Sequence, residues 1–146
     1  MAAGAGFLVA VLWFDLMFDV QVLRHRGDGE LPEPVLASIA GYYRRVTTDA
    51  RPMNRLVAMA MLGTVAGIVG ELAGDDVPAW VAIASLVAAV VAIGVAASRT
   101  VPKAVRLGAR VDAVAVQSAL ARSICREHFL CLALIGPLLV VQLIWA

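Results

Sequence analysis

Charged side chains are scarce in this sequence, and their scarcity excludes an ordinary soluble domain. Asp, Glu, Lys and Arg make up 16% of the 146 residues, whereas 62% are hydrophobic. A soluble domain has about 25% charged and about 45–50% apolar residues. A globule of this size cannot hide the apolar excess, because small domains bury a limited share of their surface. The composition therefore predicts a single domain, residues 1–146, whose solvent is a lipid bilayer.

Cysteine and histidine are equally rare, at two residues each. Cys125 and Cys131 lie six positions apart on a predicted helix, about 240° apart around its axis, which is too far for a disulfide. The sequence contains no Gly-rich phosphate loop, no Ser/His/Asp arrangement and no Cys/His metal-ligand spacing. The sequence therefore identifies no metal ligands and does not specify a cofactor. It favours a role other than catalysis. The net charge of +1 argues against nucleic acid as a partner.

Four apolar runs are long enough to cross a membrane. They cover residues 4–23, 53–73, 78–98 and 129–146. About 20 helical residues rise about 30 Å, the thickness of a bilayer core. The third run contains no charged residue, whereas a helix of a soluble protein has a polar face. We therefore predict an all-α, polytopic membrane protein whose four transmembrane helices form a bundle.

Small residues and proline are expected to shape two of these helices. Gly63 and Gly67 form a GxxxG pattern in the second run, which favours close contact with a neighbouring helix there. Pro137 lies in the middle of the last run and predicts a kink.

A short amphipathic helix is predicted over residues 34–47. Val35, Ile39, Tyr42 and Val46 recur there at helical spacing. One interpretation places this helix at the membrane surface, with its tyrosines at headgroup depth. The alternative is a helix packed against the bundle, and the sequence does not distinguish the two.

A basic helical extension on the cytoplasmic side is predicted over residues 103–126. Four basic residues fall within about a 60° arc if this region and the end of the third run are helical. They are Arg99, Lys103, Arg106 and Arg110. Such a stripe can bind anionic lipid headgroups, or its charge can serve only to set the topology.

The basic residues are confined to two windows, residues 24–55 and 99–126. With four spans, both windows lie on one side of the membrane, which the positive-inside rule makes cytoplasmic. Both termini then lie on the non-cytoplasmic side. Eleven of the twelve basic residues are Arg in a chain rich in Ala and Val, which suggests a GC-rich bacterial genome. We therefore predict a multi-pass protein of the bacterial plasma (inner) membrane.

Two carboxylates interrupt the first apolar run, and they are the strongest functional signal. Asp15 and Asp19 are four residues apart and so share one helix face. A carboxylate at mid-membrane costs about 2.5–3.5 kcal/mol on insertion scales, so each needs a partner or a proton. Polar residues at matching depth mark the cytoplasmic ends of the second and fourth runs. They are Asn54, Arg55, Arg126 and His128.

Three functions remain open for this polar cluster. If Arg55 or Arg126 neutralises Asp19, the charges are structural and the protein is a non-catalytic membrane subunit or assembly factor. If a carboxylate exchanges a proton or cation, the cluster is the binding or relay site of a small transporter, with a homodimer or larger membrane complex supplying the conduit. A metal-, haem- or quinone-dependent oxidoreductase is the third, although the chain has no Glu-x-x-His pair.

Overall fold

The structure is a computed structural model that describes residues 2–25, 27, 29–74 and 77–145, without the side chains of residues 51, 53 and 54. In this part of the chain 88% of residues are helical and no strand forms. Four helices are long and apolar enough to cross a membrane, namely Ala2–Arg24, Arg55–Leu72, Ala79–Ala109 and Val114–Ile144. The prediction of an all-α protein with four membrane-length helices is confirmed.

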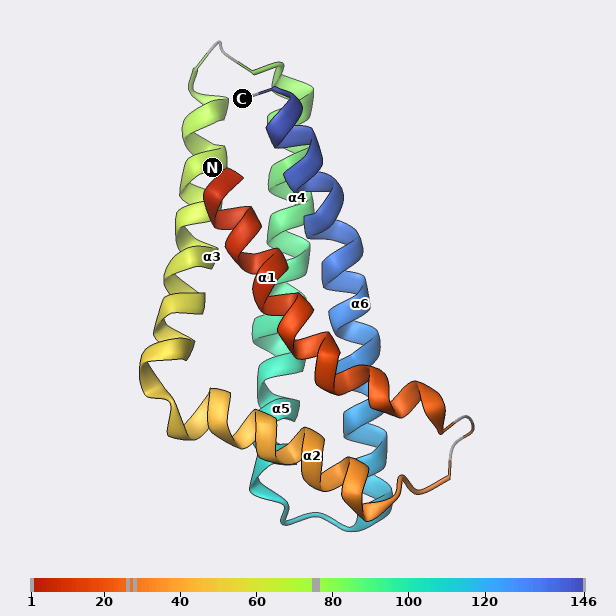
Figure 1. The fold of residues 1–146 in the computed structure, drawn as a ribbon. Helices are drawn as coiled ribbons and strands as arrows, with labels where there is room; N and C mark the ends of the chain where they lie inside the picture. Colours follow the sequence, from red (N-terminus) through yellow and green to blue (C-terminus); the bar gives the residue numbers. More distant parts are fainter. Residues whose placement is uncertain (1, 26, 28, 75–76, 146) are drawn as a thin grey trace.

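The helices follow one another with short connections (Figure 1). In chain order they are α1 (Ala2–Asp19, continued by a 3₁₀ turn at Val20–Arg24), α2 (Glu33–Arg44, continued by a π turn at Arg45–Asp49), α3 (Arg51–Leu72), α4 (Ala79–Val95, continued by a π turn at Ala96–Thr100), α5 (Val101–Ala109) and α6 (Val114–Ile144).

Proline positions explain several of these boundaries. Pro52 stands in the first turn of α3, where a missing backbone N–H costs no hydrogen bond. Pro102 lies inside a continuous helical run and directly follows the π turn at Ala96–Thr100, a local adjustment typical of a proline that lacks a backbone N–H. The third span does not end at Pro102, because the helix runs through the π turn into α5. Pro137 lies inside α6, and the helix continues past it to Ile144.

The basic segment 103–126 does not form one helix, contrary to the sequence-based prediction. α5 ends at Ala109, and Arg110 adopts the left-handed conformation with φ of 55°. A left-handed residue terminates a helix because it breaks the repeating backbone geometry. α6 then begins at Val114 and runs without interruption through the predicted fourth span.

Apolar side chains cover the outside of the long helices. Trp13 is 63% exposed, Leu62 72% and Trp80 66%. Monomeric soluble proteins rarely expose such extended apolar surface, so these faces are suited to contact with lipid. The chain has the architecture of a small multi-pass membrane protein.

The bundle core lies toward the end that carries both termini (Figure 1). Side chains of α1, α3, α4 and α6 meet there, and several are alanines, which allow the helices to approach closely. The buried members are Ala5, Leu8, Ile68, Ala89, Ala92, Cys131, Ile135 and Leu138. Both termini lie at the same end, as an even number of spans requires. Which compartment that end faces stays a prediction.

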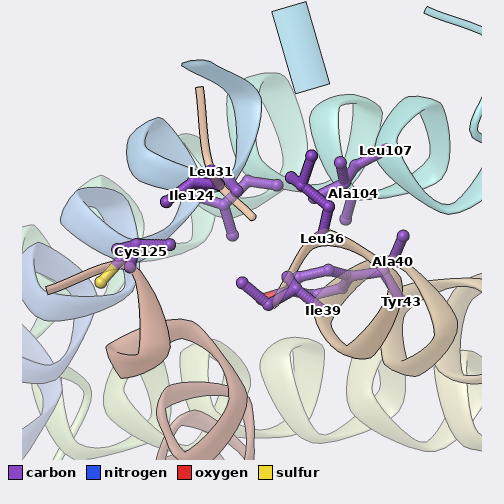
Figure 2. Close-up of a cluster of buried hydrophobic side chains, with 11 residues drawn as sticks. Leu31, Leu36, Ile39, Ala40, Tyr43, Ala104, Leu107, Ile124 and Cys125 are labelled. Atoms are coloured by element: carbon purple, nitrogen blue, oxygen red, sulfur yellow. The ribbon is translucent and has the colours of Figure 1, made fainter. Parts of the chain in front are cut away.

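A second core lies at the opposite end, where α2 runs across the bundle (Figures 1 and 2). α2 packs the side chains of Leu36, Ile39, Ala40 and Tyr43 against α5 and α6. Gly108 of α5 permits this contact, because a Cβ there would lie 2.8 Å from the backbone nitrogen of Arg44. The apolar stripe of α2 is therefore buried in protein, and its location at a membrane surface stays a prediction.

The prediction that the GxxxG pattern makes a close helix contact is wrong for Gly63. A Cβ added at Gly63 would meet nothing within 4 Å. α3 instead meets α1 at Gly4, where an added Cβ would lie 2.5 Å from Thr64 Oγ1. The close approach is made by a glycine on the other helix of the pair.

Candidate proton site between α1, α2 and α6

Asp19 is the centre of a buried polar cluster. Its side chain has no exposed surface. Oδ1 accepts a hydrogen bond of 2.6 Å from the hydroxyl of Tyr43, and Oδ2 lies 2.6 Å from Nδ1 of His128. Both oxygens of a carboxylate in the first membrane-length helix are thus satisfied by side chains from α2 and α6.

Asp15 is one helical turn away and meets the same two helices. Its Oδ1 accepts a hydrogen bond of 2.7 Å from the hydroxyl of Tyr42. Its Oδ2 lies 3.6 Å from Nε2 of His128, close enough for an ion pair but too long for a hydrogen bond. We call Asp15, Asp19, Tyr42, Tyr43 and His128 together the Asp–His–Tyr cluster.

His128 lies between the two carboxylates, with Nδ1 toward Asp19 and Nε2 toward Asp15. A neutral imidazole has one N–H, whereas an imidazolium has two. The arrangement therefore suits a protonated ring. With both carboxylates ionised and His128 protonated, the cluster carries a net charge of −1.

The sequence positions these groups by simple helix geometry. A spacing of four places Asp15 and Asp19 on one face of α1. Tyr42 and Tyr43 are adjacent on α2 and so point about 100° apart, which lets each reach a different carboxylate. Phe18 stacks on Tyr42 with ring centroids 4.2 Å apart and so holds that ring in place.

The hydroxyl groups of Tyr42 and Tyr43 keep their protons and so remain hydrogen-bond donors. Burial raises the pKa of Tyr43, and the negative charge of Asp19 raises it further. Burial also raises the pKa of Tyr42, with Asp15 adding to the effect. Both hydroxyls therefore stay protonated at every pH near neutrality.

A cavity of about 650 Å³ lies beside the cluster, bounded by α1, α2, α3 and the junction of α4 with α5. Its wall is mostly apolar and includes Val57, Met61 and Val101. Asp15 lines the cavity, but Asp19 and His128 do not. Asp15 is thus the member of the acidic pair that faces the cavity, while Asp19 is sealed behind it.

Of the predicted site residues, the structure brings together Asp15, Asp19 and His128. It does not bring Arg55 or Arg126 to the carboxylates, because both are exposed. The expected neutralisation of Asp19 by arginine is replaced by contacts with Tyr43 and His128. The side chain of Asn54 lies outside the described part of the structure.

Three of the four predicted lipid-headgroup residues are paired within the chain. Lys103 contacts Glu127, Arg106 makes two hydrogen bonds of 2.7 and 2.8 Å to Asp112, and Arg110 pairs with Glu33. The fourth residue, Arg99, is exposed. The Arg106 hydrogen bonds lower the pKa of Asp112. Binding of anionic headgroups by this stripe stays a prediction.

Sequence reasoning missed Tyr42 and Tyr43. One of the two interpretations of residues 34–47 puts both at headgroup depth, because tyrosine favours the membrane interface, and neither interpretation makes them partners of Asp15 and Asp19. The signal that could have found them is their adjacency on a helix next to a span with two unpartnered carboxylates. A buried tyrosine hydroxyl needs a hydrogen-bond partner, and the carboxyl oxygens of Asp15 and Asp19 are acceptors.

Among the residues that the structure describes, no group of three or more His, Cys, Asp or Glu side chains is arranged to hold a metal ion. His128 lies between the carboxylates and does not converge with them on a common point.

No known protein family, curated protein or solved structure matches the chain. Its class is therefore defined by fold and site alone, as a small multi-pass membrane protein with a buried Asp–His–Tyr cluster.

Proposed function

We propose that the Asp–His–Tyr cluster binds and releases a proton, and that the protein is a small proton- or cation-coupled transporter of the membrane. The observation that carries this proposal is the position of His128, with a carboxylate facing each ring nitrogen. Two membrane-length helices carry Asp15, Asp19 and His128, and an uncompensated charge inside a membrane is costly. Uptake of one proton makes the cluster electrically neutral.

The geometry supports a defined proton path. When the ring of His128 carries a proton on Nδ1 alone, a proton on Asp15 Oδ2 passes to Nε2 and gives the doubly protonated ring. The Nδ1 proton of that ring then passes to Oδ2 of Asp19. Histidine suits this role because each ring nitrogen can gain or lose a proton near neutral pH. Asp15 lines the cavity and is the point of exchange, and buried Asp19 is the inner acceptor. Tyr42 and Tyr43 orient the carboxylates by donating to their other oxygens.

A homodimer is part of the proposal. Four spans make a thin conduit, and the described chain seals Asp19 on all sides. A second copy would supply further helices around a path across the membrane. Cytoplasmic orientation of the cluster, and residence in a bacterial plasma membrane, complete the proposed picture.

Proton flux into vesicles tests this function. The purified protein is reconstituted into vesicles that enclose a pH-sensitive dye, and a pH step is applied. We expect the wild type to equilibrate faster than empty vesicles, and Asp15→Asn and His128→Gln to fall to the rate of empty vesicles. Asp49→Asn is the matched control, since Asp49 is an exposed carboxylate outside the cluster. Equal rates for the wild type and His128→Gln would refute the proposal.

A structural role is the second candidate, and one observation favours it. Asp19 is fully buried with both oxygens occupied, and it ties α1 to α2 and α6. Buried ion pairs can fix the arrangement of helices without adding function. If this alone is their role, the cluster variants lose stability while the wild type carries no proton flux.

A further inference from the structure

The cavity beside the cluster has the dimensions of a small-molecule site. Its volume of about 650 Å³ falls within the range of about 300–1,000 Å³ found for ligand pockets. Phe14 and Val101 line it and are also 59% and 48% exposed, so the cavity opens at the outer surface of the helices. A ligand dissolved in lipid can reach it from the side.

The charge of the cavity wall is of one sign. Asp15 is the acidic side chain among the described lining residues, and none of these lining residues is Lys, Arg or His. The groups that interact with Asp15 from neighbouring positions are Asp19 on α1, Tyr42 and Tyr43 on α2, and His128 on α6. With His128 protonated and both carboxylates ionised, one negative charge remains for a ligand to balance.

The remaining wall complements a hydrophobic cation. Phe14, Tyr42 and Tyr43 contribute aromatic rings to the lining, and the face of an aromatic ring attracts a cation. Most of the other lining side chains are aliphatic, and the hydroxyls of Thr47 and Thr100 are hydrogen-bonded within the protein. An inorganic cation would find few oxygen ligands in such a wall, whereas a bulky organic cation would bury apolar surface as well as balance charge.

We propose that this cavity binds a hydrophobic organic cation of single charge, with Asp15 as its counter-ion, in exchange for the proton of the cluster. This inference rests on the proposed function, since the exchange requires that the cluster hold a proton. The same negative charge is balanced either by one proton or by one cation. Binding of the cation at Asp15 therefore releases a proton, and acidification releases the cation.

Equilibrium dialysis of the purified full chain in detergent tests the inference, with tetraphenylphosphonium as the probe. Tetraphenylborate is the matched ligand control, because it has the same shape and the opposite charge. We expect saturable binding of tetraphenylphosphonium that weakens as the pH falls, and no saturable binding of tetraphenylborate. Asp15→Asn should weaken binding by about tenfold or more, which corresponds to about 1.4 kcal/mol.

A second variant keeps the test decisive if Asp15→Asn fails to fold. Ala58 lines the cavity from α3 and is not a member of the cluster, so Ala58→Phe takes up cavity space and leaves the charged residues unchanged. We expect it to weaken probe binding as well, whereas Asp49→Asn should bind like the wild type. Equal binding of both probes, or of wild type and Ala58→Phe, would overturn the inference and indicate a neutral ligand or none.

The two proposals fail separately in these experiments. If His128→Gln abolishes proton flux but tetraphenylphosphonium does not bind, the cluster is a proton site and the cation inference is wrong. If tetraphenylphosphonium binds at Asp15 without releasing protons, the exchange is wrong. If neither flux nor binding is observed, both proposals are wrong.

Discussion

Nδ1 of His128 lies 2.6 Å from Oδ2 of Asp19, although the two residues are 109 positions apart in the sequence. This contact joins the first and last membrane-length helices. Nε2 of the same ring faces Asp15, so one imidazole connects the carboxylate that lines the cavity to the one that is sealed from it.

Removal of the two carboxylate charges should have unequal effects on stability. Asp19→Asn leaves His128 without its closest anion in a fully buried site, so we expect a loss of about 2–3 kcal/mol. Asp15→Asn should cost less, about 1 kcal/mol, because its contact with His128 is longer, at 3.6 Å, and an amide oxygen can still accept the hydrogen bond from Tyr42. Thermal unfolding in detergent, followed by circular dichroism, measures both. A larger loss for Asp15→Asn would contradict the assignment of Asp19 as the inner residue.

Tyr42 and Tyr43 are the two tyrosines of the chain, so ultraviolet titration reports on the cluster alone. Burial and the nearby carboxylates raise the pKa of both above the ordinary value of about 10. The unfolded state therefore loses these protons first, and their stabilising contribution is present below pH 10 and lost as the pH rises above it. We expect tyrosinate absorbance to appear only together with unfolding.

The control for this titration is the protein unfolded in guanidinium chloride, whose tyrosines should ionise near pH 10. Circular dichroism recorded on the same samples separates ionisation from unfolding. Ordinary ionisation of either tyrosine in the folded protein would show that its hydroxyl is not held by a buried carboxylate.

Two glycine substitutions test how α2 packs on α5. Gly108→Ala places a Cβ 2.8 Å from the backbone nitrogen of Arg44, which must move, and we expect a loss of about 1–3 kcal/mol. Gly63→Ala is the matched control, because its Cβ meets nothing within 4 Å and alanine favours the helix by about 1 kcal/mol. Unfolding midpoints in detergent compare the two. Equal stability of both variants would place α2 elsewhere.

The sequence predicts the four spans and the acidic pair because both rest on local properties. The length of an apolar run determines whether a helix can cross a bilayer, and a spacing of four determines that Asp15 and Asp19 share a face. The burial of Asp19 follows from the cost of a carboxylate in hydrocarbon. None of these inferences needs knowledge of which helices are neighbours.

The partners of the acidic pair depend on helix rotation and crossing, which the sequence does not encode locally. Arg126 and His128 have similar depth, but they lie about 200° apart around α6. When His128 faces inward, Arg126 faces outward, and the structure shows it exposed. Tyr42 and Tyr43 reach the carboxylates because α2 runs across the bundle (Figure 1), which its apolar stripe alone does not predict.

The protonation of His128 tests the central claim most directly. His25→Gln leaves one histidine, whose ring nitrogens can be followed by two-bond ¹H–¹⁵N spectra of labelled protein from about pH 5 to about pH 8. We predict a ring that is protonated at both nitrogens over part of this range and loses its proton at lower pH in Asp15→Asn, where a neighbouring negative charge is gone. A neutral ring of one tautomer at every pH, unchanged by Asp15→Asn, would contradict the account.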